Sequence, residues 1–160
     1  MGSGKTTLAK KLATKLNYNW FDLDHEIETR EKLAVAQIFE EKGEEYFRRI
    51  ESETLKNIIQ NNTQFVLSVG GGTPCFYNNM NTINENGLSI YLKYNAGILT
   101  SRLINAKVKR PLIKDLNEAE LQKFIFTKLN ERAPFYEQCK FTVAGNNLKV
   151  EDLHELVFLL

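Results

Sequence analysis

The chain has 160 residues, 42% of them hydrophobic, which is enough for one domain with a sizeable core. Its 21 basic and 20 acidic residues leave a net charge of +1, and this excludes a general electrostatic attraction to nucleic acid or membrane. Any anion must therefore be bound by a local cluster. The two cysteines lack zinc or CxxC spacing, and no apolar run is long enough for a signal or transmembrane segment. We expect a single cytoplasmic, monomeric domain over residues 1–160.

Helical and strand-like patterns alternate along the chain. The predicted strands cover 18–24, 65–69, 88–92 and 140–144. The predicted helices cover about 5–16, 25–32, 35–60 with a break at Gly43, 77–86, 96–105, 118–132 and 149 onward, with a polar loop over 105–117. This alternation predicts an α/β fold with a mostly parallel sheet, in which ligands bind at the carboxyl ends of the strands. The stretches "MGSGKTT" (1–7), "DLD" (22–24) and "GGG" (70–72) occupy such positions and can share one cleft.

The first stretch has most of the pattern GxxxxGK followed by Ser or Thr, which binds nucleotide phosphates. Backbone N–H groups of Gly2, Ser3 and Gly4 can surround an anion, assisted by the helix that begins near Lys5. Lys5 would contact the β- and γ-phosphates, and the Thr6 hydroxyl would bind Mg²⁺. The alternative is a flexible segment followed by an ordinary amphipathic helix.

The pair Asp22 and Asp24 would share one face of a strand, unless the chain turns at the strand's end. One carboxylate could orient a metal-bound water and the other a substrate hydroxyl. The alternative is that Asp24 only caps the helix that follows.

The stretch "GEEYFRRIESE" places two arginines on opposite sides of a helix. At about 100° per residue, the apolar face contains Glu51, has Arg48 on its flank and has Arg49 on the opposite side. A carboxylate on such a face needs a partner, so we pair Glu51 with Arg48, which keeps donors for a substrate carboxylate. The alternative is a purely structural pair.

The consecutive glycines Gly70, Gly71 and Gly72 follow a buried strand. Three such residues are costly in chain entropy, so they indicate close approach of a ligand to the backbone rather than a simple turn, which is the alternative. Ser68 stands where strands that handle phosphate and Mg²⁺ usually carry an acid.

Two further basic segments are candidates for anion binding. Lys107, Lys109 and Arg110 lie in the polar loop, which could form a lid over a phosphoryl group or remain a solvated run of charge. Arg132 projects onto the apolar face of its helix and therefore needs an anion from the protein or a ligand. His25 and His154 are interpreted as surface or packing residues.

In order and spacing, these motifs resemble those of the shikimate kinase family from residue 1 to about Tyr136. The family's G-x-x-G-S-G-K loop corresponds to the glycine-rich start, its D-T-D to "DLD" and its F-R-x-x-E to "FRRIE". Its glycine triplet, its R-P-L lid motif and its R-x-P-L-Y correspond to "GGG", "RPLI" and "RAPFY". The loop after the last strand departs from the family, because "AGNNLK" lacks the arginine and proline often found there; Asn146 or Asn147 could contact the base instead.

The resemblance implies a three-layer P-loop kinase with strand order 2-3-1-4-5 that uses ATP and Mg²⁺ to phosphorylate the 3-hydroxyl of shikimate, in aromatic amino-acid biosynthesis. It implies that Lys5, Asp24 and Arg110 are catalytic, with Asp24 as the base and Arg110 supplied by the lid (105–117). ATP would bind to Gly2, Ser3, Gly4, Lys5, Thr6, Thr7 and Arg110. Mg²⁺ would bind to Thr6 and, through water, to Asp22. Shikimate would bind to Asp24, Arg48, Gly70, Gly71, Gly72 and Arg132, with Phe39 and Phe47 packed near its ring.

Two other functions compete with this one. A gluconate-type kinase would act on a neutral polyol, which does not need two arginines that converge on a carboxylate. A non-catalytic nucleotide-binding module would have lost the lysine, an acid or the lid arginine, and all of these are present.

The expected order also lacks its central strand, together with the first glycine of the phosphate loop (residues 1–7 form a partial motif). Five apolar side chains buried there would contribute about 8–15 kcal/mol, at roughly 1.5–3 kcal/mol each. Because a whole domain is stable by only about 5–15 kcal/mol, we expect roughly 6–10 further residues upstream of Met1.

Overall fold

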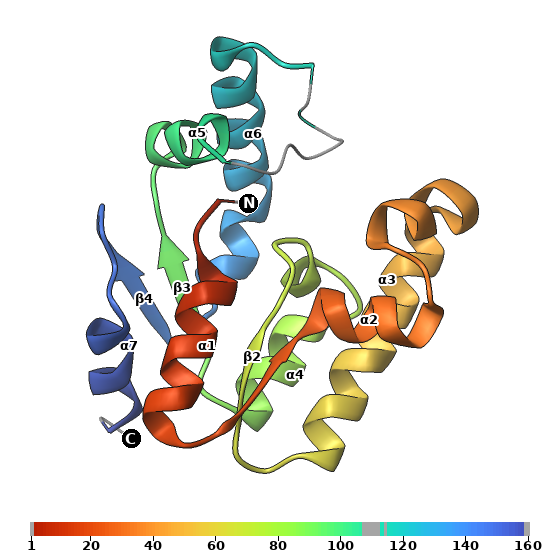
Figure 1. Ribbon diagram of the computed structural model, residues 1–160, viewed down its shortest axis with the longest axis vertical. Helices are drawn as coiled ribbons and strands as arrows, with labels where there is room; N and C mark the ends of the chain where they lie inside the picture. The colour runs from red at the N-terminus through yellow and green to blue at the C-terminus, as the bar shows by residue number, and fades with distance from the viewer. Residues whose placement is uncertain (1, 107–112, 114, 159–160) are drawn as a thin grey trace.

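The computed structural model describes residues 2–106, 113 and 115–158 and has an α/β architecture (Figure 1). The four strands in this part of the chain are β1 (Asn19–Asp22), β2 (Phe65–Ser68), β3 (Ile90–Lys93) and β4 (Phe141–Ala144). The helices are α1 (Lys5–Leu16), α2 (Leu23–Glu31), α3 (Val35–Asn61), α4 (Asn79–Asn86), α5 (Ala96–Ile104), α6 (Glu118–Tyr136) and α7 (Val150–Val157), with a 3-10 turn η1 at Thr73–Cys75. Most of the predicted lid, including Lys107, Lys109 and Arg110, lies outside the described residues.

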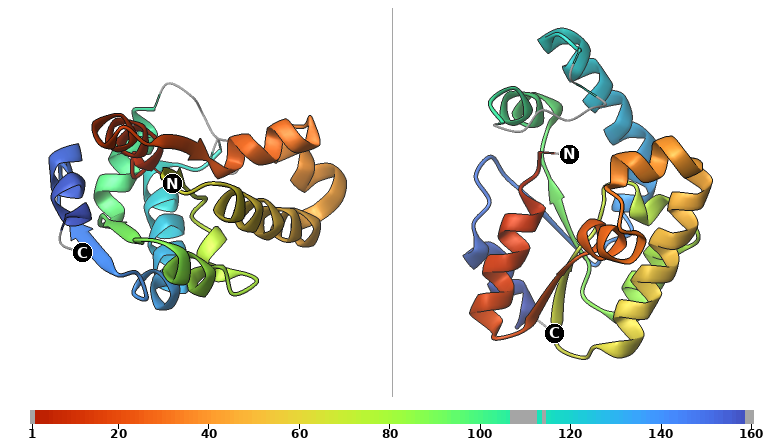
Figure 2. Two further views of the ribbon diagram at one scale, coloured as in Figure 1. Left: turned by 90° about the horizontal axis from the view of Figure 1, so that it is seen from below. Right: turned by 45° about the vertical axis from the view of Figure 1, so that its right-hand side comes forward.

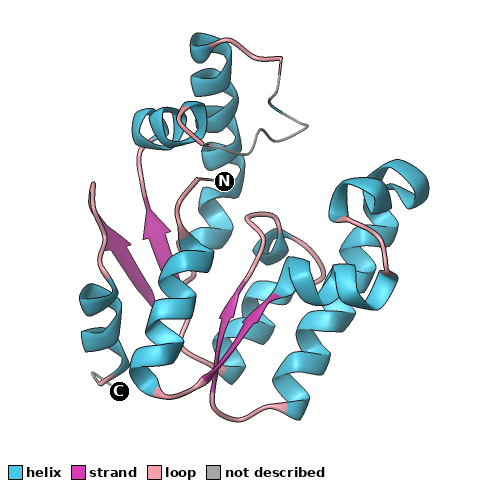
Figure 3. Ribbon diagram, viewed as in Figure 1, coloured by secondary structure: helices cyan, strands magenta, loops and turns pink. Residues whose placement is uncertain are grey.

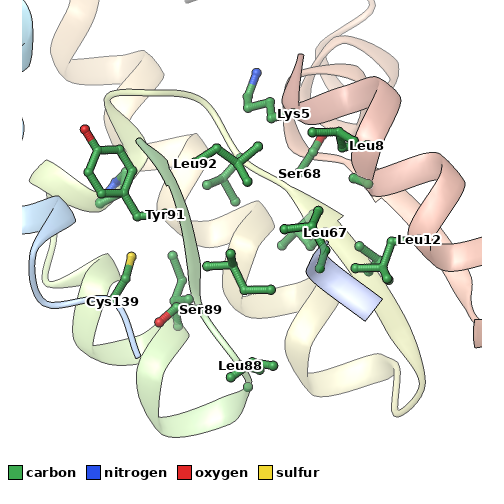
Figure 4. A pocket seen from close by; sticks show the side chains of 18 of the residues that line it. Lys5, Leu8, Leu12, Leu67, Ser68, Leu88, Ser89, Tyr91, Leu92 and Cys139 are labelled. Atoms are coloured by element: carbon green, nitrogen blue, oxygen red, sulfur yellow. The ribbon is translucent and has the colours of Figure 1, made fainter. Parts of the chain in front are cut away.

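The strands form two separate parallel pairs (Figure 3). β1 pairs with β2, with Trp20 opposite Val66, and β3 pairs with β4, with Tyr91 opposite Thr142. A cavity of about 480 Å³ separates β2 from β3, and Figure 4 shows leucines of α1, β2 and β3 along its walls. The described strands therefore form two half-sheets instead of one continuous sheet.

Each half-sheet has its own hydrophobic core. One core gathers buried residues of α2 and α3 around Leu23, Ile27 and Ile50. The other gathers residues of α5 and α6 around Leu99, Leu121 and Ile125. Figure 2 shows, from two further directions, that α1 and α7 lie side by side while α2 and α3 pack on the other half of the molecule. The cavity is thus bordered by both cores.

The predicted helices and strands are present, although the ends of several differ, among them the strand predicted over 88–92, which covers Ile90–Lys93, and the helix predicted over 25–32, which covers Leu23–Glu31. The first strand stops at Asp22 instead of continuing to residue 24, because the Asp22 side chain accepts a hydrogen bond from the Asp24 N–H (3.2 Å) and caps α2. The helix predicted over 77–86 begins at Asn79, after a turn. Helix α6 continues through Pro134 to Tyr136, and the bond from the Glu137 N–H to the Ala133 carbonyl (2.9 Å) extends it past the proline.

The predicted break in the long helix is confirmed. Gly43 has φ 81° and ψ 170°, a backbone conformation essentially restricted to glycine, and it divides α3 into two segments. No helix in the described part of the chain combines the length and the hydropathy that crossing a bilayer requires.

Candidate active site

The phosphate-loop residues lead directly into α1. Gly2 (φ 70°) and Gly4 (φ 77°) both adopt left-handed conformations that glycine tolerates, and Gly4 caps the helix. The N-terminal N–H groups of α1, beginning at Lys5, therefore have no intrahelical partner and face the loop. Lys5 lies at the same end of the cavity as Ser68 (Figure 4). This arrangement is suited to binding a polyphosphate.

Asp22 is the centre of a network of oxygen atoms beside this loop. The hydroxyls of Thr6 and Ser68 donate hydrogen bonds to its Oδ2, at 2.9 and 2.7 Å. Partial burial works to raise the pKa of Asp22, but the hydroxyl bonds from Ser68 and Thr6 and the charge of Lys5 outweigh it, and the pKa is lowered. An ionised carboxylate with two hydroxyls offers the hard oxygen ligands that Mg²⁺ prefers.

Asp24 lies apart from Asp22, in the first turn of α2. A Cβ atom built on Gly70 would lie 3.4 Å from Oδ1 of Asp24 and 3.2 Å from Oε1 of Glu51. The two aspartates therefore face different surroundings, because the chain turns into a helix between them. The helix cap that sequence analysis offered as an alternative for Asp24 is instead supplied by Asp22.

Arg48 is almost surrounded by protein groups. Its Nη1 donates to Glu51 (2.9 Å), and its Nε and Nη2 both donate to Oε1 of Glu44 (3.2 Å each). Three phenyl rings lie near its Cζ, those of Phe39, Phe47 and Phe76. By contrast, Arg49 pairs with Glu53 (2.8 Å) on the surface, as the helical projection predicted.

Glu51 is 1% exposed and is held by two donors. Besides Arg48, the Thr73 hydroxyl donates to its Oε1 at 2.6 Å. Burial raises the pKa of Glu51, assisted by the charge of Asp24 and opposed by Thr73 and Arg48. The Glu51 carboxylate thus holds Arg48 and, through Thr73, connects it to the turn after the glycines.

Arg132 reaches the same turn from α6. A Cβ built on Gly71 would lie 2.9 Å from Nη1 of Arg132 and 3.1 Å from the Tyr136 hydroxyl, which donates to the Gly71 carbonyl at 2.5 Å. Burial raises the pKa of Tyr136, and the nearby Arg132 opposes this. Arg132 therefore points inward, in agreement with the helical projection.

Three side chains predicted to bind substrate thus each lie beside one glycine of the triplet. Asp24 approaches Gly70, Arg132 approaches Gly71, and Nη2 of Arg48 would lie only 2.7 Å from a Cβ on Gly72. At these distances of 2.9 and 2.7 Å, a side chain at the second or third glycine would displace the guanidinium groups of Arg132 and Arg48 from their present positions. The triplet therefore serves the convergence of α2, α3 and α6 beside the end of β2.

Some site residues escaped the sequence analysis. Arg102 of α5 donates to the carbonyls of Ser3 (3.4 Å) and Asn146 (3.1 Å) and lies over the Tyr94 ring, so it joins the phosphate loop to the loop after β4. No local pattern distinguishes Arg102. Tyr136 had a usable signal, since it lies four residues after Arg132 on the same helix.

Comparison with known proteins finds similar proteins over nearly the whole chain. The model of the shikimate kinase family matches residues 1–158. A shikimate kinase of Azobacteroides pseudotrichonymphae is 44% identical over 155 residues, which are 97% of this chain and 91% of the relative. The crystal structure of shikimate kinase from Bacteroides thetaiotaomicron has a TM-score of 0.94 at 38% identity, covering 99% of this chain and 94% of that one.

A shikimate kinase from Acinetobacter baumannii, solved in complex with shikimate, has a TM-score of 0.85 at 30% identity and covers 99% of this chain and 86% of that one. Family match, identity and structural similarity all extend over nearly the entire chain. The chain belongs to the shikimate kinase family.

Proposed function

We propose that this chain transfers the γ-phosphoryl group of ATP to the 3-hydroxyl of shikimate, a step of aromatic amino-acid biosynthesis. The observation that carries this proposal is the convergence of Asp24, Arg132 and Arg48 on the glycine triplet, next to the phosphate loop. The substrate that the Acinetobacter relative binds, shikimate, supports the choice of acceptor.

The substrate carboxylate would be bound by Arg48 and Arg132. The two guanidinium groups lie beside consecutive glycines, and a planar carboxylate bound there would accept hydrogen bonds from both. This favours an acidic acceptor over the neutral polyol of a gluconate-type kinase. Gly70, Gly71 and Gly72 would contact the same ligand.

The acceptor hydroxyl would be held by Asp24, which could take its proton as phosphoryl transfer proceeds. Thr6 and Asp22 would hold Mg²⁺, Asp22 through a water molecule, and their oxygen network fits that ion. When bound, Mg²⁺ would neutralise the charge of the phosphates.

The triphosphate would lie on the N–H groups of Gly2, Ser3 and Gly4 and on the first turn of α1, with Lys5, Thr6 and Thr7. These positions combine a helix N-terminus with a fixed positive charge, which together stabilise the charge that develops during transfer. Arg110 would contribute from the lid. Its role is carried by the family motif alone, because it lies outside the described residues.

We further propose that the cavity between the half-sheets takes an apolar strand, which would complete the order 2-3-1-4-5. The pairs β1–β2 and β3–β4 are those that this order requires on either side of the central strand. The walls are core-type side chains such as Leu12, Leu67 and Leu92, which an apolar strand would match. Lys5 and Gly71 both line the cavity, and a strand that ended beside them would lead into the phosphate loop.

We also propose that the enzyme acts as a cytoplasmic monomer. Cys75 and Cys139 are both free thiols, which is compatible with a reducing compartment.

The decisive assay couples ADP release to shikimate and to a panel of neutral polyols. We expect turnover with shikimate only, and we expect Arg132→Ala and Arg48→Ala each to raise the KM for shikimate about 10- to 150-fold, as for a lost charge-assisted hydrogen bond. The KM for ATP should not change. Arg49→Ala is the matched control, since Arg49 is a surface neighbour on the same helix. Turnover with polyols but not shikimate, or arginine variants that weaken ATP instead, would overturn the assignment.

A further inference from the structure

Phe76 covers the guanidinium of Arg48 more closely than the other two phenyl rings do. Its ring centroid lies 4.4 Å from Cζ of Arg48, against 5.2 Å for Phe47 and 5.7 Å for Phe39. The other two rings belong to α3, the helix that carries Arg48 itself, whereas Phe76 comes from the segment that follows the glycines. Phe76 is also 36% exposed, so this contact with Arg48 reaches the molecular surface.

A turn of unusual backbone conformation holds Phe76 in this place. The Asn79 N–H donates to the Phe76 carbonyl (2.9 Å), which closes a four-residue turn. The two central residues, Tyr77 (φ 50°) and Asn78 (φ 58°), are both left-handed although neither is glycine. Residues other than glycine keep such conformations only where the surrounding structure imposes them.

The surrounding structure that imposes the turn is a buried amide. Asn79 is fully buried, accepts a hydrogen bond from the Ser52 hydroxyl (2.8 Å) and donates one to the Thr73 carbonyl (3.0 Å). Ser52 lies on α3, one turn after Arg48. The guanidinium belongs to α3 through Arg48 itself, and the turn that carries the Phe76 ring is bound to α3 through the hydrogen bond between Asn79 and Ser52. The ring and the guanidinium are therefore both positioned by the same helix.

We propose that Phe76 is a positioning residue for the acidic substrate, which keeps the Arg48 guanidinium flat against Gly72 and shields the bond between Arg48 and the substrate carboxylate from water. A ring face over a guanidinium attracts it and restricts its rotation. Excluding water strengthens the attraction between opposite charges. The role rests on the proposed function, because it concerns the same acceptor.

The position of Cys75, next to Phe76 in the chain, supports this placement. Burial raises the pKa of the Cys75 thiol, and the charges of both Arg132 and Arg48 oppose that rise. The segment that carries Phe76 thus lies within electrostatic reach of both arginines, where a substrate carboxylate would bind.

The test compares Phe76→Ala and Phe76→Leu with Phe76→Tyr and with Phe126→Ala, a matched control that removes a 59% exposed phenyl ring on α6. The leucine variant keeps apolar bulk without a ring face, and the tyrosine variant keeps the face. KM and kcat are measured for shikimate and for ATP, and shikimate binding is measured by calorimetry. Thermal melts show whether each variant folds. If Phe76→Ala does not fold, Phe76→Leu alone tests the loss of the ring face.

We expect the alanine and leucine variants to raise the KM and the Kd for shikimate about 3- to 30-fold, the range of a partly exposed cation–π contact. Their kcat should fall less than about threefold, and their KM for ATP should stay unchanged. Their KM should also rise more steeply with added NaCl, because an ion pair exposed to water is screened by salt. The tyrosine variant should behave like the wild type.

The proposal is overturned if Phe76→Leu and Phe76→Ala have the same KM for shikimate, and the same dependence of that KM on salt, as the control Phe126→Ala. It is also overturned if the KM for ATP rises equally. A wild-type chain that neither binds nor phosphorylates shikimate would instead overturn the proposed function, and the role of Phe76 for this substrate with it.

Discussion

Among single residues, two carboxylates, Glu44 and Glu51, hold the guanidinium of Arg48 in place. Glu51 is nearly inaccessible to water and is bound by Arg48 and Thr73. Glu51 and Asp24 both lie beside Gly70. Removing one partner of a buried ion pair strongly destabilises the folded state, because the other charge stays buried without compensation. The network therefore maintains Arg48 in position before any substrate binds.

The raised pKa of Glu51 predicts a pH dependence of stability. A carboxyl with a higher pKa in the folded than in the unfolded state binds its proton more tightly when folded. Its contribution to the free energy of unfolding is therefore full below the unfolded-state pKa of about 4.3 and is lost as the pH rises through the higher folded-state pKa.

We expect Glu51→Gln to remove this component. Urea unfolding of wild type and variant across the acidic to neutral range measures it, and the difference between the two free energies should change with pH in that window. A difference that is independent of pH would contradict the raised pKa of Glu51. The variant should also raise the KM for shikimate, because Arg48 loses the negative charge of its buried partner.

At the scale of elements, the bend in α3 builds the aromatic surroundings of Arg48. Phe39 precedes Gly43 and Phe47 follows it, yet their rings lie 4.5 Å apart. The bend turns the first segment of the helix back toward the second, so that both rings lie near the guanidinium. A straight helix would place residues eight positions apart about 12 Å from each other along its axis.

Two glycines of opposite character allow a matched test of this bend. Gly43→Ala should destabilise the protein by about 1–3 kcal/mol, because its backbone conformation suits glycine alone although the space around it is open. Gly97→Ala, inside α5, meets only ordinary contacts and should stabilise by about 0.4–1 kcal/mol. Urea denaturation measures both changes. Equal effects at the two positions would argue against a backbone requirement at Gly43.

In the whole molecule, the cavity between the half-sheets separates the two hydrophobic cores. Two cores meet at a space of about 480 Å³ with apolar walls, and each inner strand, β2 and β3, has one edge toward it. Unpaired strand edges and exposed apolar surface both favour pairing with a further strand.

An added N-terminal segment tests the strand proposal. We expect an extension of roughly 6–10 residues, an apolar strand with a loop glycine, to raise the Tm by more than about 15 °C, since about 8–15 kcal/mol of burial is gained. Amide exchange in β2 and β3 should slow as their edges become paired. An extension of equal length rich in proline and serine is the control. Equal melting temperatures and activities for both extended chains and the unextended chain would contradict the proposal that an apolar strand fills the cavity.

Sequence patterns were most informative where one element determines the outcome. The periodicity of α3 distinguishes Arg48 from Arg49, because which side of a helix a residue occupies follows from its position alone. The left-handed glycines of the phosphate loop follow from a local motif. Asp24 shows what a local pattern does not reveal. It belongs to a helix because the Asp22 side chain caps that helix, and a stretch with two aspartates does not indicate which of the two is the cap.

The family, the α/β alternation and the chemical types of the candidate site residues could be predicted from the sequence, because they depend on local spacing and on the order of motifs. The positions of Asp24, Arg132 and Arg48 beside separate glycines, the link that Arg102 makes between two loops and the contact of Phe76 with Arg48 could not be predicted. These contacts join residues far apart in the chain. They depend on how α2, α3, α5 and α6 pack together, and local periodicity carries no information about that packing.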